Sequence, residues 1–378
     1  MKCKLSEICE YRKGKVDVST LTCDTYISTE NMLTNRGGIR QATSLPLTKQ
    51  TQEYKKGDVL VSNIRPYFKK IWIADRNGGC SNDVLVFKSK EQVDADFLYY
   101  VLSDDNFFAY SMLTAKGTKM PRGDKKKIMQ YEVPQFNENQ QKKIAYILGL
   151  FDKKIKLNNK INNNLFEQMQ ALYKAWFIDF KPFNGIRPEN WKDTNIYAIA
   201  NIIYGAPFAS KLFNTDGLGK PIIRIRDLKE QLFVTFTTEE HPKGHLIHPG
   251  DIVVGMDGEF RPYLWGNEPA WLNQRVCIFE NNRPQGKAFV LYTIKPLLNK
   301  IEQTQVATTV IHIGKKDFDS FRIILPDETT LNNFDSITAP MIDKIVNNCL
   351  ENKKLTVLRD KLLPKLISGE IDISNINL

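Results

Sequence analysis

The sequence predicts an α+β protein: two mixed α/β globular domains joined by two long helices, which form an antiparallel coiled coil with pseudo-two-fold symmetry. Three observations predict this class. The chain repeats its motifs at an offset of about 190 residues. Each copy places strand-like runs before a long helical pattern. The two helical patterns carry asparagines at matching positions.

The repeat is visible in the order and spacing of short motifs, and self-similarity at a fixed offset indicates a duplicated structural unit. The matching pairs are KGDVLV (56–61) with PGDIVV (249–254), Arg65-Pro66-Tyr67 with Arg261-Pro262-Tyr263, SNDVLVF (81–87) with NQRVCIF (273–279), and Val133-Pro134 with Leu325-Pro326. The predicted parts are a first globular domain (1–135), a first spacer helix (136–180), a second globular domain (181–328), and a second spacer helix with a C-terminal tail (329–378).

The globular parts show strand signals separated by short helical patterns. The strand-like runs are rich in Val and Ile and are bounded by Gly, Asn and Asp: DVLVSNI, KIWIA, VLVFK, PIIRI, DIVVGM and RVCIF. A helical pattern covers residues 94–111. Pro and Gly in residues 179–192 predict the linker between the two copies.

The first long helix has a heptad seam, because its apolar positions step alternately by four and three residues from 144 to 176. Asn158 and Asn162 interrupt this seam, and Asn348 and Asn352 interrupt the second helix at the same places. Antiparallel pairing sets Asn158 against Asn352 and Asn162 against Asn348. Buried asparagines in a seam cost stability but fix register. The alternative is that this Asn-rich stretch is an exposed helix centre.

One layer of the predicted seam is mismatched, because it sets Phe151 against Arg359. The aliphatic part of an arginine can cover an aromatic ring, so the mismatch is tolerable.

Composition narrows the function. The net charge of +10 and a pI near 9.1 point modestly to nucleic acid, and a soluble basic protein without this function is the alternative. No apolar run reaches the roughly 18 residues of a membrane span, and the N-terminus lacks the apolar core of a signal peptide. The six cysteines are scattered without a C-x-x-C pair, which suits a reducing compartment. We therefore expect a cytoplasmic protein without membrane association.

Catalytic signatures are missing from the sequence. It contains no P-loop, no G-x-G-x-x-G and no Asn/Asp-Pro-Pro-aromatic tetrapeptide. Glu351-Asn352-Lys353 has the E-x-K form of many nucleases, but it falls on the second long helix, where outward charges are expected. His241, His245 and His248 lie in a Pro- and Gly-containing stretch that favours a polar loop over a metal site. We predict no catalytic residues and no metal.

Three stretches carry a resemblance to a known family: KGDVLVSNIRPYFKK (56–70), the segment 134–183 that begins PQFNENQQKKIAYILGLFDKKI, and ENKKLTVLRDKLLPKLISGEIDI (351–373). With the two-copy layout, which covers essentially the whole chain, they resemble the specificity subunit of type I restriction-modification systems.

The resemblance implies that each globular domain is a target recognition domain that reads one half of an interrupted double-stranded DNA sequence. It implies that the helices act as a spacer and dock two methyltransferase subunits, and that restriction/translocase subunits join them in host defence. The chain itself would be non-catalytic and directs DNA methylation of adenine, or cleavage, by its partners. No cofactor is expected in this chain; S-adenosylmethionine, ATP and Mg are expected on partner subunits.

Residues that contact DNA can be predicted only from their chemistry, since side chains must reach base edges or phosphates. In the first domain the candidates are Arg36, Arg40, Asn63, Arg65, Tyr67, Lys69, Lys70, Ser81, Asn82, Lys116, Thr118 and Lys119. In the second domain they are Arg224, Arg226, Asp257, Arg261, Tyr263, Asn273, Gln274, Thr308 and Thr309. Arg65 and Arg261 recur in both copies, so a phosphate contact or an internal ion pair suits them better than base reading.

Two other interpretations stay open from the sequence. One is a stand-alone DNA-acting enzyme with a divergent active site. The other is a helical adaptor that binds no DNA, with the coiled coil as its interaction surface.

Overall fold

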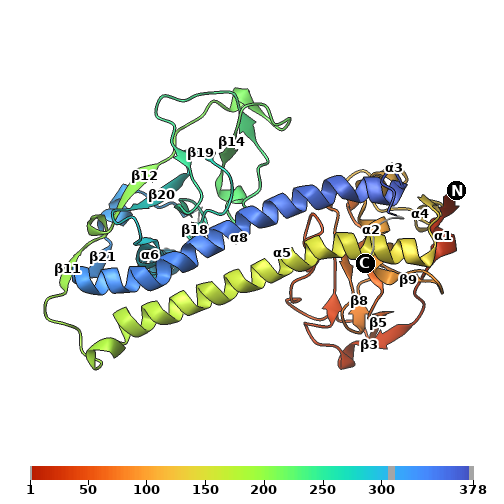
Figure 1. Ribbon diagram of the computed structural model, residues 1–378, viewed down its shortest axis with the longest axis horizontal. Helices are drawn as coiled ribbons and strands as arrows, with labels where there is room; N and C mark the ends of the chain where they lie inside the picture. Colours follow the sequence, from red (N-terminus) through yellow and green to blue (C-terminus); the bar gives the residue numbers. More distant parts are fainter. Residues whose placement is uncertain (1, 305–310, 374–378) are drawn as a thin grey trace. The chain divides into compact units, whose positions relative to one another are not determined.

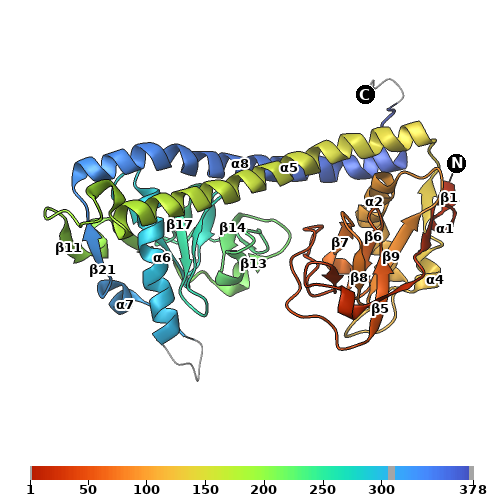
Figure 2. The same ribbon diagram turned by 90° about the horizontal axis from the view of Figure 1, so that it is seen from below.

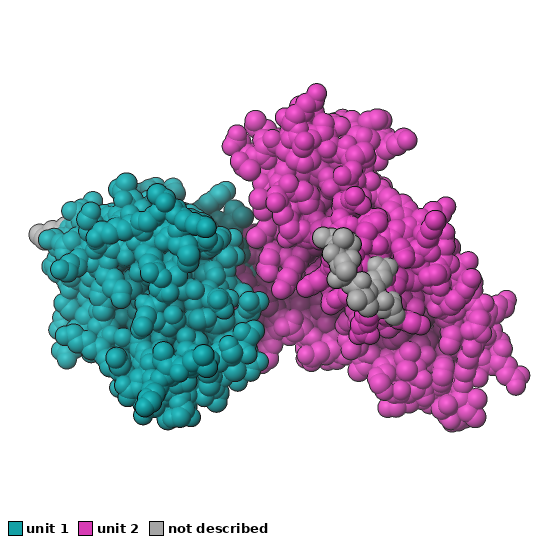
Figure 3. Space-filling model, turned by 180° about the vertical axis from the view of Figure 1, so that it is seen from behind, with its two compact units in different colours: residues 1–153, 355–378 teal, residues 154–354 magenta. Residues whose placement is uncertain are grey.

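The computed structural model describes residues 2–304 and 311–373 of the 378-residue chain, which form two compact units (Figure 3). Unit 1 contains residues 1–153 and 355–378, and unit 2 contains residues 154–354. Each long helix contributes one part to each unit. For this reason the division falls within the helices, whereas the sequence-based scheme placed its boundaries at the helix ends.

Unit 1 contains three antiparallel or mixed sheets. Its strands pair as β1 (Lys2–Lys4) with β10 (Glu132–Pro134); as β2 (Cys9–Tyr11), β9 (Val84–Ser89), β6 (Val59–Ser62) and β7 (Ile71–Ile73); and as β3 (Lys15–Asp17), β5 (Gln50–Tyr54), β8 (Gly78–Cys80) and β4 (Tyr26–Ile27). Strand β6 is buried along its whole length because both faces of its sheet are covered. Val59 and Val61 pack toward the helices, and Leu60 packs toward Tyr54 and Trp72.

Four short helices complete the globular part of unit 1: α1 (Leu5–Ile8), α2 (Ala95–Ser103), α3 (Asp105–Leu113) and α4 (Lys125–Ile128). Helix α2 lies between the β2-β9-β6-β7 sheet and α5 (Figure 2). The predicted helix over 94–111 is divided at Asp104. The backbone of Asp104 is extended, and its carboxylate accepts a hydrogen bond from the Asn106 N–H, so it caps α3.

Unit 2 repeats this arrangement with a larger second sheet. Its strands pair as β11 (Lys192–Asn195) with β21 (Arg322–Leu325); as β12 (Ala200–Tyr204), β20 (Val276–Asn281), β17 (Ile252–Gly255) and β18 (Pro262–Leu264); and as β13 (Phe213–Asn214), β15 (Phe236–Thr237), β14 (Lys220–Ile223), β19 (Ala270–Leu272) and β16 (Leu246–Ile247). Its short helices are α6 (Lys287–Thr304) and α7 (Lys315–Asp319).

The two units share one turn at the motif that first indicated the repeat. Gly57 and Gly250 both have positive φ, 90° and 91°, which favours glycine. The Gly57 N–H donates to Ala74 O at 2.8 Å, and the Gly250 N–H donates to Trp265 O at 2.7 Å. The next residue in each copy is an aspartate, Asp58 or Asp251. Its carboxylate accepts a hydrogen bond from the backbone N–H of the residue three positions earlier. The predicted duplication is therefore confirmed at the level of topology and turn geometry.

The two predicted spacer helices are α5 (Glu138–Tyr173) and α8 (Glu328–Ser368), drawn in yellow-green and blue in Figure 1. Within unit 2 they run antiparallel. Asn158 Nδ2 donates to Asn352 Oδ1 at 2.9 Å, and Asn348 Nδ2 donates to Asn162 Oδ1 at 2.7 Å. The predicted amide pairs are present and Asn158, Asn162 and Asn348 are buried, which excludes an exposed helix centre. Their role in fixing register stays a prediction.

Within unit 1 the helices also pair antiparallel, and a charged contact replaces the amides. The Arg359 guanidinium donates to Asp152 Oδ1 at 2.6 Å, and the Tyr100 hydroxyl of α2 donates to Asp152 Oδ2 at 2.6 Å. Arg359 therefore pairs with the neighbour of Phe151, which explains how the mismatched layer is accommodated. Helix α5 ends in a π-helical turn, Lys174–Ile178, before the predicted linker. Among the described residues, no helix is long and apolar enough to cross a membrane.

Candidate nucleic-acid interface

The edge of unit 1 where β6 ends and β9 begins is built by three backbone hydrogen bonds. The Asn63 N–H donates to Asp83 O at 2.8 Å, the Gly123 N–H donates to Asn63 O at 3.3 Å, and the Arg65 N–H donates to Pro121 O at 2.8 Å. An isolated bridge joins Ile64 to Arg122. Residues 121–123 thus extend the sheet beside the end of β6, although they are distant in sequence.

Charged side chains gather at this edge. Arg122 Nη2 lies 3.1 Å from Asp83 Oδ1, with side chains that are 56% and 34% exposed. Lys116 pairs with Asp124 at 3.0 Å, and a bridge joins Lys116 to Arg122. Lys116, Thr118 and Lys119 are all exposed, so the predicted loop presents two lysine ammonium groups and a hydroxyl to solvent beside this edge.

The predicted Arg36 loop packs against the Arg-Pro-Tyr turn. The Asn35 N–H donates to Phe68 O at 2.9 Å, and the Arg36 N–H donates to Lys69 O at 2.9 Å. The Arg36 side chain is only 8% exposed; it donates to Ser103 O at 2.7 Å and forms an ion pair with Asp105. Lys69 reaches the same carboxylate at 2.8 Å. These contacts make Arg36 and Lys69 positioning residues of the loop.

The charge balance around Asp105 is consistent with that role. Burial alone would raise the pKa of Asp105, but the hydrogen bond from Lys69 and the charge of Arg36 outweigh it and lower the pKa.

The remaining predicted residues of unit 1 divide into buried and exposed groups. Asn63 is buried, and Arg65 adopts a left-handed backbone with φ of 50°. Lys70 donates to Thr29 O at 2.6 Å, and burial lowers its pKa. Tyr67 and Asn82 are exposed. A polar hollow of about 450 Å³ brings Arg40 and Ser81 together with Asp83.

Unit 2 builds the same edge with the same backbone pattern. The Met256 N–H donates to Arg275 O at 2.9 Å, the Ile313 N–H donates to Met256 O at 2.9 Å, and the Gly258 N–H donates to Ile311 O at 3.0 Å. An isolated bridge joins Asp257 to His312.

The side chains at this second edge form a three-membered cluster. His312 Nδ1 lies 2.6 Å from Asp257 Oδ1 and 3.3 Å from Arg275 Nη1. Arg275 Nε lies 3.7 Å from Asp257 Oδ2. The predicted Asp257 is therefore part of the edge. Asn273 is bridged to Ala206, and Gln274 lies with Arg275 in the turn before β20.

The proposed equivalence of Arg65 and Arg261 is wrong. The backbone hydrogen bonds make Gly258 the counterpart of Arg65, and both residues have positive φ. Arg261 lies just before β18 and forms an ion pair with Glu302 of α6. Its Nη1 also donates to Asn299 at 3.2 Å. Arg261 therefore forms the internal ion pair that the sequence left open as an alternative.

The other predicted residues of unit 2 occupy different surroundings. Arg224 donates to Thr235 and lies over the Phe213 ring, whereas Arg226 is exposed. Tyr263 packs against the unit 2 core. Thr308 and Thr309 lie outside the described residues.

Sequence reasoning missed Asp83, Arg122, Arg275 and His312. The sequence offered only weak signals for them: Asp83 and Arg275 directly precede strands, and Arg122 directly precedes a glycine. The contacts between these residues join distant segments, so their proximity could not be read from the sequence.

The described residues contain no group of three or more His, Cys, Asp or Glu side chains that could hold a metal ion. The E-x-K residues are used in packing: Glu351 accepts from Asn158 at 2.7 Å, and Lys353 donates to Gln231 O at 3.2 Å.

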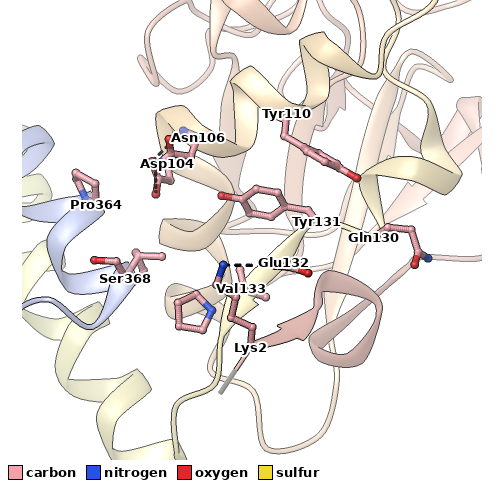
Figure 4. Close-up of a pocket in the computed structure, with 12 residues that line it drawn as sticks. Lys2, Asp104, Asn106, Tyr110, Gln130, Tyr131, Glu132, Val133, Pro364 and Ser368 are labelled. Atoms are coloured by element: carbon pink, nitrogen blue, oxygen red, sulfur yellow. Dashed lines mark hydrogen bonds and ion pairs between the residues drawn. The ribbon is translucent and has the colours of Figure 1, made fainter.

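A pocket of about 530 Å³ lies elsewhere in unit 1 (Figure 4). It is lined by the β1–β10 pair, the start of α3 and the last turns of α8, including Tyr110, Tyr131, Pro364 and Ser368. Lys2 and Glu132 pair across its rim at 3.4 Å. The lining is made of strand and helix ends.

Comparisons with known proteins agree with the two-copy architecture. A family model described as type I restriction modification DNA specificity domain matches residues 1–167 and again residues 188–359. The type I restriction enzyme MjaIX specificity subunit of Methanocaldococcus jannaschii is 24% identical over 309 residues, covering 76% of this chain and 71% of the relative. The HindI specificity subunit of Haemophilus influenzae is 23% identical over 401 aligned positions, covering 84% and 87%.

A solved structure shows the same fold. The crystal structure of the S subunit of a type I restriction-modification system from M. genitalium superposes with a TM-score of 0.57 at 18% identity, and the match covers 99% of this chain and 96% of that one.

Proposed function

Because the chain belongs to the family of type I restriction-modification specificity subunits, we propose that each unit reads one half of an interrupted double-stranded DNA sequence. The observation that carries this proposal is the repeated edge at the ends of β6 and β17. Both edges have one backbone pattern, and each presents exposed charged side chains. Cations supply phosphate contacts, and mixed polar groups supply base contacts.

The chain works in this proposal as the targeting component of a larger complex. Two methyltransferase subunits dock on the helices and methylate adenine, and restriction/translocase subunits join them. The chain itself is non-catalytic and holds no cofactor, while S-adenosylmethionine, ATP and Mg belong to the partners. In this proposal the complex acts in the cytoplasm.

The face of α5 supports a docking role. Tyr146 and Leu150 are large apolar side chains of unit 1 that are about half exposed. Their spacing of four residues places them on one face of the helix. Exposed apolar side chains gathered in this way are typical of interaction sites. Replacing Tyr146 and Leu150 with Ser is expected to reduce co-purification of the methyltransferase subunit. Asn163→Ser is the matched control, because Asn163 is exposed on the same helix but lies about 100° around the helix axis from Tyr146.

The central test is methylation mapping. The chain is co-expressed with a methyltransferase subunit encoded beside it, in a host without DNA methylation, and methyladenine is mapped by single-molecule sequencing. The expected result is a two-part motif with a fixed gap that disappears when this chain is omitted. Exchanging residues 1–135 for those of a relative should change only one half of the motif. Methylation that is indifferent to this chain would support the adaptor alternative instead.

A further inference from the structure

The edges of the two units share three structurally equivalent positions, at which the side chains differ. The positions are 64, 83 and 122 in unit 1 and 257, 275 and 312 in unit 2; we name each set the edge triad. Three pairs of backbone hydrogen bonds establish the correspondence, since Asn63 to Asp83 matches Met256 to Arg275 and the bonds from Gly123 and Ile313 match likewise. The bridge of Ile64 to Arg122 matches that of Asp257 to His312.

The residues that shape the turn before β6 and β17 are retained, whereas the outward-facing residues at the far ends of these strands are not. Gly57 and Asp58 match Gly250 and Asp251 in sequence, φ and hydrogen bonding. The edge triads instead contain Ile, Asp and Arg in unit 1, and Asp, Arg and His in unit 2. The carboxylate and the guanidinium therefore occupy different positions of the triad in the two units: Asp83 corresponds to Arg275, and Asp257 corresponds to Ile64. This is the arrangement that two readers of different half-sites require.

The triads offer the chemistry of base reading. Arginine donates to O6 and N7 of guanine in the major groove, and aspartate accepts from the N4 amino group of cytosine. Arg122 with Asp83, and Arg275 with Asp257, each place a donor fork beside an acceptor. Exposed ion pairs contribute little to the stability of the fold. These side chains can therefore give up their mutual contact and bind the edge of a base pair at a small cost in free energy.

The carboxylates carry the argument further. A carboxylate close to DNA is repelled by phosphates and offers nothing to a guanine O6 or N7 acceptor. A carboxylate favours binding only where a base amino group donates a hydrogen bond to it. It therefore weakens binding to wrong sequences and strengthens binding to the right one. An edge that served only phosphate contact would carry cations alone.

We infer that the edge triads are the specificity-determining residues of the two units, and that each half-site contains a G·C pair read by Arg122 with Asp83 or by Arg275 with Asp257. This inference rests on the proposed function, because it assumes that these edges face DNA.

The experiment uses the whole chain co-expressed with the methyltransferase subunit, with methyladenine mapped by sequencing. R122Q is expected to lower the preference for guanine at one position of one half-site by about 10-fold, the worth of a good bidentate contact. The other half and the gap stay unchanged. R275Q is expected to act in the same way on the other half. Lys88→Gln is the matched control, because Lys88 is five residues from Asp83 along β9, roughly 17 Å away.

The outcomes separate the inference from the proposed function. If the wild-type chain gives no two-part motif, the proposed function fails. If the wild type gives the motif and both arginine variants retain it unchanged, or lose methylation equally at all sequences while folded by circular dichroism, the inference fails. Should R122Q not fold, D83N and R275Q decide the question by the same criteria. The exchange I64D/D83R/R122H provides a gain-of-function arm, because it should move one half-site toward the base preference of the other.

Discussion

The Asn348 side chain donates a hydrogen bond to Asn162 at 2.7 Å, in a helix pair where these residues are 1% and 6% exposed. Asn162 in turn donates to the Ile345 carbonyl and to the Cys349 sulfur, both at 3.4 Å. Two apolar side chains would fill the same layer with less desolvation. We therefore expect the amide pair to fix the alignment of the two helices, since a slipped helix would leave these groups without partners.

The first prediction concerns this pair. Asn348→Leu alone should cost about 1–3 kcal/mol in the free energy of unfolding, because it leaves a buried amide unsatisfied. Asn162→Leu with Asn348→Leu should be nearly neutral or stabilising. Urea denaturation of the two single variants and the double variant measures the coupling.

The loss of alignment needs its own measurement. Spin labels at the exposed positions Lys156 of α5 and Lys354 of α8 report the register within unit 2. The double variant should broaden the distance distribution between them. A sharp loss of stability in the double variant, with one narrow distance, would show that the amides do something other than fix register.

The second prediction concerns Asp152 and Arg359, the polar contact between the helices in unit 1. Their side chains are 30% and 11% exposed, and the Tyr100 hydroxyl also donates to Asp152. Arg359→Met should lower the free energy of unfolding by about 2–3 kcal/mol, because it leaves a half-buried carboxylate without its cation. The exposed pair of Lys142 and Glu138 on α5 is the control; Lys142→Met should change stability by about 0.5 kcal/mol or less. Equal effects of the two variants would contradict the prediction.

The third prediction is a pH dependence from Tyr100. Burial and the Asp152 charge raise the pKa of Tyr100 well above its ordinary value of 10. The folded state therefore holds this proton when the unfolded chain releases it. The stabilisation is complete below pH 10 and decreases as the pH rises further.

Urea unfolding of the wild type between pH 9.5 and 11 should show decreasing stability. Tyr100→Phe should make the slope shallower by up to about 1.4 kcal/mol per pH unit. Tyr146→Phe, at a half-exposed ring on α5, is the matched control. Parallel curves for the wild type and Tyr100→Phe would refute the linkage.

Much of the fold was predictable because it depends on local periodicity and on duplication. The heptad steps predict that the two long helices pair. The recurrence of Asn158 and Asn162 at Asn352 and Asn348 predicts that they pair antiparallel. The KGD and PGD motifs gave the shared turn, because a glycine with positive φ and a following aspartate are required there. Helix 94–111 was predicted as one element because a single Asp104 turn hardly disturbs its apolar pattern.

The interface was less predictable because its contacts join distant segments. Arg36 was chosen as an exposed loop cation, yet it folds onto Ser103 and Asp105, which follow almost 70 residues later. Arg65 and Arg261 share a tripeptide but not a position, since the chain inserts residues before Arg261. Conversely, Arg122 was overlooked because the residues next to it in the sequence do not indicate that it pairs with Asp83.

The last prediction separates phosphate contact from base reading in unit 1. Lys119 is exposed in the loop that leads to Arg122 and is bound to no carboxylate in the described structure. If it contacts a phosphate, Lys119→Ala should weaken DNA binding about equally for all sequences. It should also reduce the slope of log K against log salt concentration by about 1, because one fewer counterion is released.

Fluorescence anisotropy of the complex with the methyltransferase subunit, at several salt concentrations, measures this slope. Lys88→Ala, whose side chain pairs with Glu10 at 3.3 Å, is the control of equal charge. A variant of Lys119 that keeps the wild-type slope, or that alters the methylated sequence, would place the residue away from phosphate or on a base edge. Because Arg122→Gln should instead change the preferred base, the two variants together distinguish the contact that gives affinity from the contact that gives specificity.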